Sequence, residues 1–446
     1  MKKIISCLAL LIISCSVFTQ TISETIDELL KIYARQYAFN GSVLVAQKGN
    51  ILLQKGYGYK NFNAHSLNDE KTVSQVGSIT KQFTAAIILQ LQEKNMLSVQ
   101  DKLSKYIPDY PGGDKITVEN LLTHTAGIFN YTNDAAFMKS EAAKPLSLEH
   151  LIGLFKNKSL DFQPGEKFNY SNSGYILLGY IIEKLTGRPY FRVVKENIFQ
   201  PLHMDHSGFD FNDLADTNKA TGYFKLTAKR NQPATIVDSS VSYAAGSIYT
   251  TVGDLYKWDR ALYTNQIIST ASRELAFTPH QSNYGYGWII DSAYGKKVVM
   301  HEGGIFGFVS FIGRIPADET CIILFDNHQC PVLAKIAEDI NSILNNQLYE
   351  FPQPRNEIEI DSAILRQYVG EYQLGPGFIV NVTLEDGQLM AQGTGQGKVE
   401  LYAERNDFFY TKIINAQLEF FRDASGRVTR MDLYQDGRQL QGKKIK

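Results

Sequence analysis

The sequence predicts an α+β protein: one antiparallel sheet flanked by helices, followed by a small, separate antiparallel β-barrel domain. Three observations support this. The chain of 446 residues is longer than one ordinary domain. Strand-like alternation occurs near residues 41–59 and again near residues 285–325, with helical patterns between them, which favours one sheet built from both ends of the body. After residue 360, short strands alternate with turns, which is typical of a small barrel.

Residues 1–19 are predicted to be an export signal that is not part of the fold. Two lysines precede an apolar run, Ile4 to Ile13, that is too short to span a bilayer. Two processing outcomes stay open: a cut ahead of Gln20, which we favour slightly, or lipidation of Cys15 in a sequence similar to a bacterial lipobox. Either outcome predicts an exported protein, periplasmic or secreted, and only the lipidated form would be anchored to a membrane.

The body of the protein is expected over residues 20–350, where segments of helical or alternating periodicity are separated by turn residues. A linker with two prolines follows at residues 351–359, and the β domain is expected over residues 360–446. The expected helices of the body cover residues 23–37, 78–97, 146–155, 173–186, 252–262 and 334–345, and its expected strands cover residues 41–46, 51–59, 285–291, 298–301, 307–314 and 320–325.

Composition narrows the classes of partner. Hydrophobic residues make up 44% of the chain and charged residues 20%, as in folded globular proteins. A net charge of −1 provides no basic surface of the kind that binds nucleic acid. Only Cys321 and Cys330 lie outside the signal, with Cys321 expected in a buried strand, and His203 and His206 lack a third ligand at a recognisable spacing. We therefore expect no disulfide scaffold, no metal site and no cofactor.

Ser78 and Lys81 form a candidate nucleophile–base pair at the start of an expected helix. Positions three apart share one face of a helix, so the Lys81 amine would lie beside the Ser78 hydroxyl. A serine hydroxyl needs a base within hydrogen-bond reach before it can attack a carbonyl. A lysine is such a base only when it is neutral, and apolar neighbours together with the helix N-terminus favour the neutral amine. Taken alone, the same pattern is also explained by a serine that caps the helix.

Two later motifs supply further candidates. Tyr170 and Asn172 occur where a loop leads into a helix, so the phenol could relay a proton and the amide could bind a substrate carbonyl. A core tyrosine before a capped helix is the simpler interpretation. His301 follows at the end of an apolar strand, ahead of Glu302 and two glycines that permit close approach of the backbone. A histidine at this place could bind substrate, and a turn histidine is the simpler interpretation.

In this order, the motifs resemble those of the serine β-lactamase and penicillin-binding-protein superfamily. The likeness is strongest to the branch that groups class C β-lactamases, D-aminopeptidases and family VIII-type esterases, and it covers about residues 25–345. It implies a β-lactamase/transpeptidase-like fold for the body, and the C-terminal part resembles the lipocalin-like β domain appended to such proteins. The segments that support the resemblance are Gly77–Thr84, Leu121–Gly127, Pro164–Glu166, Tyr170–Asn172 and His301–Gly304.

The resemblance implies a role for each matching position. Ser78 would be the acylated nucleophile, Lys81 its partner, and Tyr170 the general base or acid. Whether Lys81 or Tyr170 takes the first proton stays open. The backbone N–H groups of Ser78 and Gly304 would form an oxyanion hole. The substrate-binding residues that the resemblance implies are Asn172, His301, Glu302, Gly303 and Gly304.

Two departures from the superfamily's Lys-Thr-Gly motif bear on the substrate. Glu302 stands where a hydroxyl helps to bind a substrate carboxylate, and two carboxylates about 4 Å apart repel each other by on the order of 1–4 kcal/mol. His301 replaces a permanent cation. Both departures favour a serine hydrolase that acts on an ester, an amide or a D-amino-acid peptide bond. The partner would be a small molecule or a short peptide, with peptidoglycan-derived peptides among the candidates.

Two alternatives stay open. The chain could be a true β-lactamase or a DD-carboxypeptidase, since proteins of this superfamily share one site. From another class, it could be a low-turnover module that binds cell-wall peptides or a partner protein.

Overall fold

The computed structural model describes residues 21–227, 231–330, 332–353, 355–385, 387–412, 414–435 and 437–446. The expected export signal lies outside these residues and stays a prediction. Within the described residues the chain forms two parts, which we call the body (residues 22–344) and the barrel (residues 370–444). None of the described helices combines the length and the apolar character that a membrane crossing requires.

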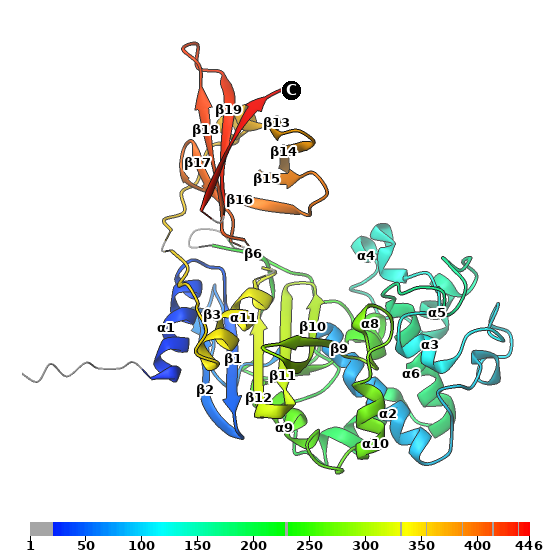
Figure 1. Cartoon of the computed structure of the whole chain (residues 1–446). Helices are drawn as coiled ribbons and strands as arrows, with labels where there is room; N and C mark the ends of the chain where they lie inside the picture. Colours follow the sequence, from blue (N-terminus) through cyan, green and yellow to red (C-terminus); the bar gives the residue numbers. More distant parts are fainter. Residues whose placement is uncertain are drawn as a thin grey trace, which may run out of the picture.

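A six-stranded antiparallel sheet forms the centre of the body (Figure 1). Its strands run in the order β2-β1-β12-β11-β10-β9, so strands from the two ends of the body lie side by side; for example, Val43 pairs with Leu324. This confirms the predicted sheet. The strand bounds are Gly41–Gln47 (β1), Asn50–Tyr57 (β2), Ile289–Ala293 (β9), Lys296–Ile305 (β10), Phe308–Ile315 (β11) and Thr320–Asp326 (β12).

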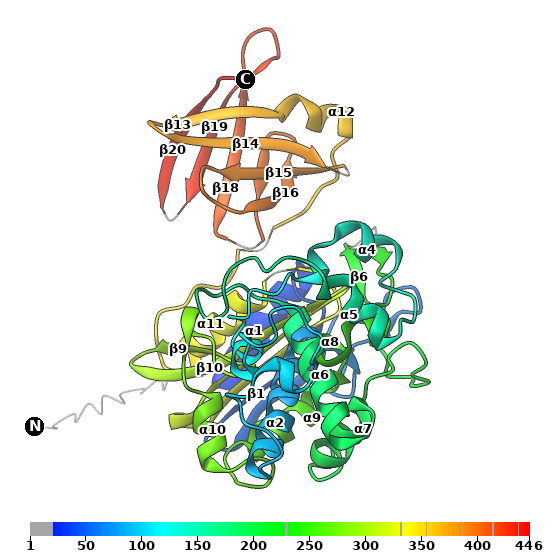
Figure 2. The same ribbon diagram turned by 90° about the vertical axis from the view of Figure 1, so that its right-hand side faces the viewer.

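Helices cover both faces of this sheet. On one face, α1 (Ile22–Arg35) and α11 (Leu333–Leu344) pack against each other and bury apolar residues of β1 and β12. The other face holds a larger core that includes α2 (Thr80–Glu93), α6 (Asn172–Thr186) and α8 (Ser239–Gly246). These three helices contact one another (Figure 2). α2 and α6 supply Lys81 and Asn172, and β10 of the sheet supplies residues 301–304, so the site lies where this helical layer meets the sheet.

Short elements connect the layers of the body. The strands β3 and β4, β5 and β8, and β6 and β7 form three two-stranded pairs. The remaining helices and strands of the body are α3 (Val118–Leu122), α4 (Ala135–Ser140), α5 (Leu148–Lys156), α7 (Tyr190–Val194), α9 (Val252–Ala261), α10 (Thr270–Ala276), β3 (Tyr59–Asn61), β4 (Ser66–Leu67), β5 (Ser74–Gln75), β6 (Tyr223–Leu226), β7 (Asn231–Pro233) and β8 (Tyr249–Thr250).

The structure differs from the expected elements at three places near the candidate residues. Ser78 lies in a short 3₁₀ turn, η1 (Gly77–Ile79), and α2 starts only after it. His301 was expected at a strand end, but β10 continues to Ile305, which pairs with Phe308 of β11, so the histidine lies within a strand. α8 was expected as loop, because its serine-, alanine- and glycine-containing sequence has no clear helical periodicity.

The C-terminal part is a closed antiparallel barrel of eight strands, which confirms the predicted β-barrel. Tyr372, Leu401 and Phe420 belong to its buried interior. A short helix, α12 (Ser362–Leu365), precedes the first strand. The strand bounds are Gly370–Gly375 (β13), Phe378–Glu385 (β14), Gln388–Gly393 (β15), Lys398–Arg405 (β16), Phe408–Tyr410 (β17), Ala416–Arg422 (β18), Val428–Gln435 (β19) and Arg438–Lys444 (β20).

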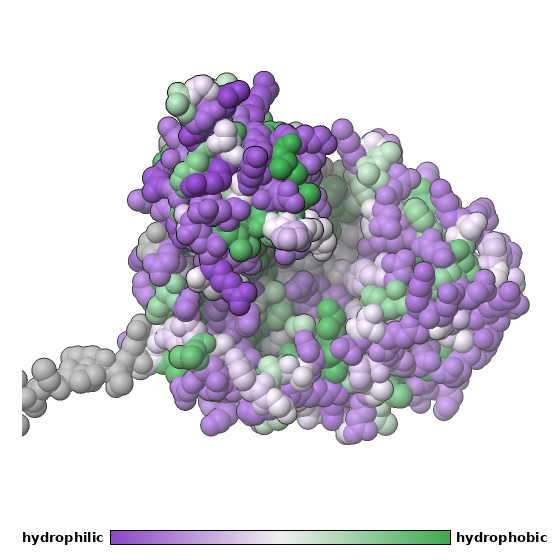
Figure 3. Space-filling model, turned by 45° about the horizontal axis from the view of Figure 1, so that its top comes forward, coloured by the Kyte–Doolittle hydropathy of each residue, from purple (hydrophilic) through white to green (hydrophobic). Residues whose placement is uncertain are grey.

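The barrel stands at one end of the body and is joined to it by polar contacts. Lys225 on β6 donates a hydrogen bond to Gln388 on β15 (2.8 Å). Lys412, whose side chain is 2% exposed, pairs with Glu357 of the linker (2.9 Å) and lies 4.0 Å from the ring centroid of Tyr402. Figure 3 shows that the surface is hollowed between the barrel and the body. The linker and the barrel therefore share an ion pair whose lysine is buried and whose glutamate is partly exposed.

Candidate active site

Ser78 and Lys81 meet at the junction of η1 and α2. Lys81 Nζ lies 2.9 Å from Ser78 Oγ, 2.8 Å from Asn172 Oδ1 and 2.9 Å from the carbonyl oxygen of Ala245. The lysine is fully buried, with 0% of its surface exposed. The spacing of three residues brings Lys81 and Ser78 together. The oxygens of Asn172 on α6 and Ala245 on α8 come from distant parts of the chain.

The hydrogen-bond partners of Lys81 decide how its amine and the Ser78 hydroxyl share a proton. Burial lowers the pKa of the Lys81 amine well below its ordinary value. A neutral amine has two N–H groups and one lone pair. The side-chain oxygen of Asn172 and the carbonyl of Ala245 can only accept hydrogen bonds, so they take the two N–H groups. In this neutral form the lone pair faces Ser78 and accepts from its hydroxyl, whereas the protonated amine donates to Ser78 Oγ.

Tyr170 lies just ahead of α6, next to the serine–lysine pair. Its ring packs on His124, with centroids 4.1 Å apart, and lies 4.8 Å from Lys81 Nζ. Its buried hydroxyl has no hydrogen-bond partner among the described residues. Burial raises the pKa of this phenol, and the nearby Ser78 hydroxyl lowers it by less, although the two hydroxyls are not in hydrogen-bond geometry. A neutral phenol with an unused hydroxyl therefore lies beside Ser78.

Asn172 begins α6 and is held in one orientation by the protein. Its Nδ2 donates to Thr132 Oγ1 (3.1 Å), and its backbone N–H donates to Asn130 Oδ1 (3.1 Å). These contacts leave the side-chain oxygen directed at Lys81. The amide lines the cavity beside Ser78 while it also orients the lysine.

His301 is 3% exposed, and both of its ring nitrogens have partners. Nδ1 faces the backbone carbonyl of Glu302, which can only accept, so Nδ1 has the proton. Nε2 therefore accepts from the Tyr284 hydroxyl, 2.8 Å away. Burial, with a smaller effect from Lys81, lowers the pKa of His301 to about 3, so the ring is neutral near pH 7. In this arrangement His301 has no free N–H for a substrate.

Glycines let β10 approach η1 closely. A side chain at Gly303 would come within 2.0 Å of the carbonyl oxygen of Val76 and 2.3 Å of Ser310 Oγ. Gly77 has a φ of +49°, and a side chain there would come within 2.9 Å of the Gly304 nitrogen. The backbone that contains the Ser78 N–H therefore lies against the backbone of Gly304, which is where an oxyanion hole would need both groups.

A cavity of about 260 Å³ opens beside Ser78. Among the described residues, its lining includes no charged side chain. A ligand in this cavity would meet apolar groups and neutral hydrogen-bonding groups. The lining residues are Ser78, Tyr131, Thr132, Met138, Asn172, Val237, Val241, Ser242, Ala245, Gly246, Gly304, Ile305, Phe306 and Gln329.

Sequence reasoning missed two groups that organise the site. The carbonyl of Ala245 follows a kink in α8 at Tyr243, whose φ of 36° and ψ of −131° are rare for a residue with a side chain. Tyr284 orients His301 from a short irregular segment before β9. Neither residue belongs to a motif, so only a long-range contact could reveal them.

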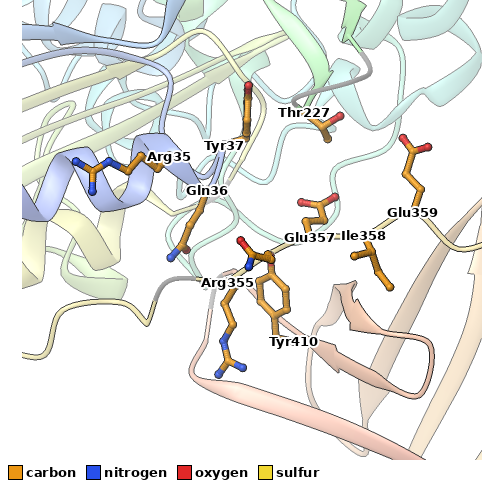
Figure 4. Close-up of a pocket in the computed structure, with 10 residues that line it drawn as sticks. Arg35, Gln36, Tyr37, Thr227, Arg355, Glu357, Ile358, Glu359 and Tyr410 are labelled. Carbon is orange, nitrogen blue, oxygen red and sulfur yellow. The ribbon is translucent and has the colours of Figure 1, made fainter.

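A second cavity has a different lining. Figure 4 shows one of about 210 Å³ between the end of α1, the linker and the barrel. Its lining includes Arg35, Arg355, Glu357 and Glu359 but no serine or cysteine. Within the described residues, no group of three or more histidine, cysteine, aspartate or glutamate side chains is arranged to hold a metal ion. Cys321 and Cys330 are both buried free thiols, which confirms the expectation for Cys321.

Comparison with known proteins agrees with this geometry. Residues 22–340 match the beta-lactamase family. The chain belongs to this family. Residues 354–444, which include the barrel, match a domain of unknown function (DUF3471). The lipocalin-like resemblance of the barrel stays a prediction.

The relatives of this beta-lactamase-family chain include penicillin-binding proteins and an amidohydrolase. Penicillin-binding protein 4* of Bacillus subtilis (strain 168) is 29% identical over 447 residues, which cover 94% of this chain and 96% of the relative. The octameric penicillin-binding protein homologue from Pyrococcus abyssi is 26% identical with a TM-score of 0.66, covering 94% and 99% of the two chains. A D-stereospecific amidohydrolase from Streptomyces sp. is 27% identical with a TM-score of 0.61, covering 69% and 96%. The chain is thus a member of a serine hydrolase superfamily.

Proposed function

We propose that this beta-lactamase-family chain is an exported serine hydrolase that forms an acyl-enzyme on Ser78. Its substrate is an ester, an amide or a D-amino-acid peptide bond. The observation that supports this most directly is the 2.9 Å contact between Lys81 Nζ and Ser78 Oγ. The other two partners of that amine can only accept hydrogen bonds, so a neutral Lys81 is poised to take the serine proton.

In the proposed first step, Lys81 takes the Ser78 proton while the serine oxygen bonds to the substrate carbonyl carbon. The backbone N–H groups of Ser78 and Gly304 stabilise the oxygen that becomes negative. Tyr170 then gives its phenolic proton to the leaving group and regains a proton from Lys81. In the second step a water molecule attacks the acyl carbon and gives a proton to Lys81, which returns it to the departing Ser78 oxygen.

His301 acts as a positioning residue in this proposal. Its ring is neutral and hydrogen-bonded to Tyr284 on one side and to its own strand on the other. It thereby fixes the part of β10 that leads to Gly304. The lack of a charged group in the described lining of the cavity favours neutral substrate groups there, because a buried carboxylate would lose water without gaining a partner.

Export is part of the proposal and rests on the two lysines and the short apolar run of residues 1–19. Mass spectrometry of the protein from the native host tests it. A mature N-terminus at Gln20 supports simple export, and a lipid-modified Cys15 supports membrane anchoring. An intact Met1 in cytoplasmic extracts would refute export.

The serine hydrolase itself is tested by covalent labelling and by turnover. We expect a fluorophosphonate probe to label wild-type protein, but not Ser78→Ala, and the label to map to Ser78. Ser425→Ala, in an exposed turn of the barrel, is the matched control and should label normally. Turnover is measured with p-nitrophenyl esters, D-amino-acid p-nitroanilides and nitrocefin. An unlabelled wild type, or a Ser78→Ala variant with full turnover, would refute the proposal.

A further inference from the structure

Glu302 occupies a position on β10 that faces the region around Ser78. Side chains alternate along a strand, so residues 302 and 304 share a face while His301 and Gly303 point the other way. The burial pattern agrees, because positions 301 and 303 are buried and positions 302 and 304 are exposed. Gly304 lines the Ser78 cavity. The Cα atom of Glu302 therefore lies about 6.6 Å along the strand from that of Gly304, whose N–H is expected in the oxyanion hole.

The Glu302 carboxyl is partly removed from water without a partner. Burial raises its pKa, and no neighbouring cation or hydrogen bond among the described residues opposes the rise. Glu141, by contrast, pairs with Lys144 at 3.1 Å. The structure thus holds a carboxylate without a described partner on the strand face that it shares with Gly304, outside the lining of the Ser78 cavity.

The surroundings of Glu302 do not supply the missing cation. Lys81 is fully buried, and its hydrogen bonds go to Ser78, Asn172 and Ala245. The described lining of the cavity has no charged side chain. A substrate that covers Glu302 removes more water from the carboxylate, which is unfavourable unless the substrate itself brings a positive charge.

We propose that Glu302 binds a cationic ammonium group of the substrate, about one strand repeat from the scissile carbonyl. This rests on the proposed function and narrows it to esters and amides that have such a cation near the bond to be cleaved. A substrate with a carboxylate at this place is repelled, and a neutral one leaves Glu302 unpaired.

The test uses matched thioesters that differ only in a nitrogen cation and the isosteric carbon. Acetylthiocholine and S-(3,3-dimethylbutyl) thioacetate differ on the leaving-group side, and phenyl 4-(trimethylammonio)butanethioate and phenyl 5,5-dimethylhexanethioate differ on the acyl side. Thiol release gives kcat/KM for each compound with the full mature chain. The enzymes compared are wild type, Glu302→Gln, and Glu274→Gln, which removes an exposed carboxylate on α10.

We expect wild type to prefer the cation in at least one pair, and Glu302→Gln to lower that preference about fivefold to thirtyfold, which corresponds to about 1–2 kcal/mol. The neutral compounds should change less than about twofold, and Glu274→Gln should behave as wild type. Equal preferences in wild type and Glu302→Gln for both pairs would overturn the inference.

The two proposals fail in different ways. If fluorophosphonate labels Ser78 but neither pair shows a cation preference, or no thioester is cleaved, the role of Glu302 is wrong and the serine hydrolase stands. If wild type is not labelled at all, the proposed function itself is wrong. Circular dichroism of Glu302→Gln distinguishes a loss of preference from a loss of fold, which is not expected at an exposed position.

Discussion

Two buried basic side chains in the body, Lys81 and Arg314, have opposite surroundings. Arg314 on β11 is 1% exposed and its Nε donates to Asp259 Oδ1 on α9 at 2.7 Å. Lys81 is as deeply buried, yet its partners are a hydroxyl and two neutral oxygens. A guanidinium cannot lose its charge in a protein and needs a carboxylate, whereas a lysine can become neutral. Arg314, which has a structural role, is thus neutralised by a carboxylate, whereas Lys81, the proposed catalytic amine, has no counter-charge.

The largest effect expected from this contrast is on activity. Lys81→Met keeps the shape of the side chain and removes the proposed base, so kcat/KM should fall by about 10²–10⁴-fold. Its melting temperature should equal or exceed that of wild type, because a buried amine without a counter-charge no longer has to lose its water. Hydrolysis of the best substrate and thermal unfolding measure both quantities. Activity above a tenth of wild type would show that Lys81 is not the base.

Arg314→Met should show the reverse behaviour. It leaves the fully buried Asp259 without its cation, so the free energy of unfolding should fall by about 3–5 kcal/mol, as measured by urea unfolding. The activity of the molecules that remain folded should be unchanged. In the double variant with Asp259→Leu most of the loss should be recovered, because no unpaired charge remains. A double variant as unstable as Arg314→Met would mean that the loss of unfolding free energy comes from a change of shape and not from an unpaired charge.

The same contrast marks the limit of prediction from the sequence. The contact between Ser78 and Lys81 could be predicted because three residues along a helix fix it. The sheet could be predicted because its strands alternate. The contact between Lys81 and the Ala245 carbonyl could not be predicted, because the two residues are 164 positions apart. The carbonyl also follows a backbone kink that no residue type indicates.

His301 shows a second limit. Its motif gave its place in the chain, but the side to which its ring points depends on the register of β10 against β11 and on Tyr284. A shift of one residue in register would turn the ring to the opposite face. The alternation of buried and exposed positions along β10 is the only local signal for this, and the two glycines of the motif itself, Gly303 and Gly304, weaken it.

A smaller effect is expected from Tyr284→Phe, which tests whether His301 acts through its position. The change removes the donor to His301 Nε2 and leaves a buried acceptor unsatisfied, at a cost of about 1–3 kcal/mol in unfolding free energy. If the ring fixes β10, kcat/KM should also fall about tenfold, equivalent to about 1.4 kcal/mol. Tyr286→Phe, which removes a hydroxyl bonded to Glu119 outside the cavity, is the control and should keep kcat/KM within about twofold. Equal activity of the two variants would assign His301 a purely structural role.

The smallest effect, up to about 1.4 kcal/mol for each pH unit, concerns the pH dependence of stability. The pKa of Lys81 is lowered in the folded state, so between that lowered pKa and the ordinary value of about 10.4 the unfolded chain binds one proton more than the folded chain. Stability contributed by this group must therefore rise with pH across that window and level off above it.

Lys81→Met lacks this contribution, while every other titrating group is shared, so the difference in unfolding free energy between variant and wild type isolates Lys81. Urea unfolding at several pH values below 10 should show the advantage of the variant shrinking as pH rises. A difference that does not change with pH would mean that Lys81 stays protonated when buried, as Arg314 does, and that another group must take the proton of Ser78.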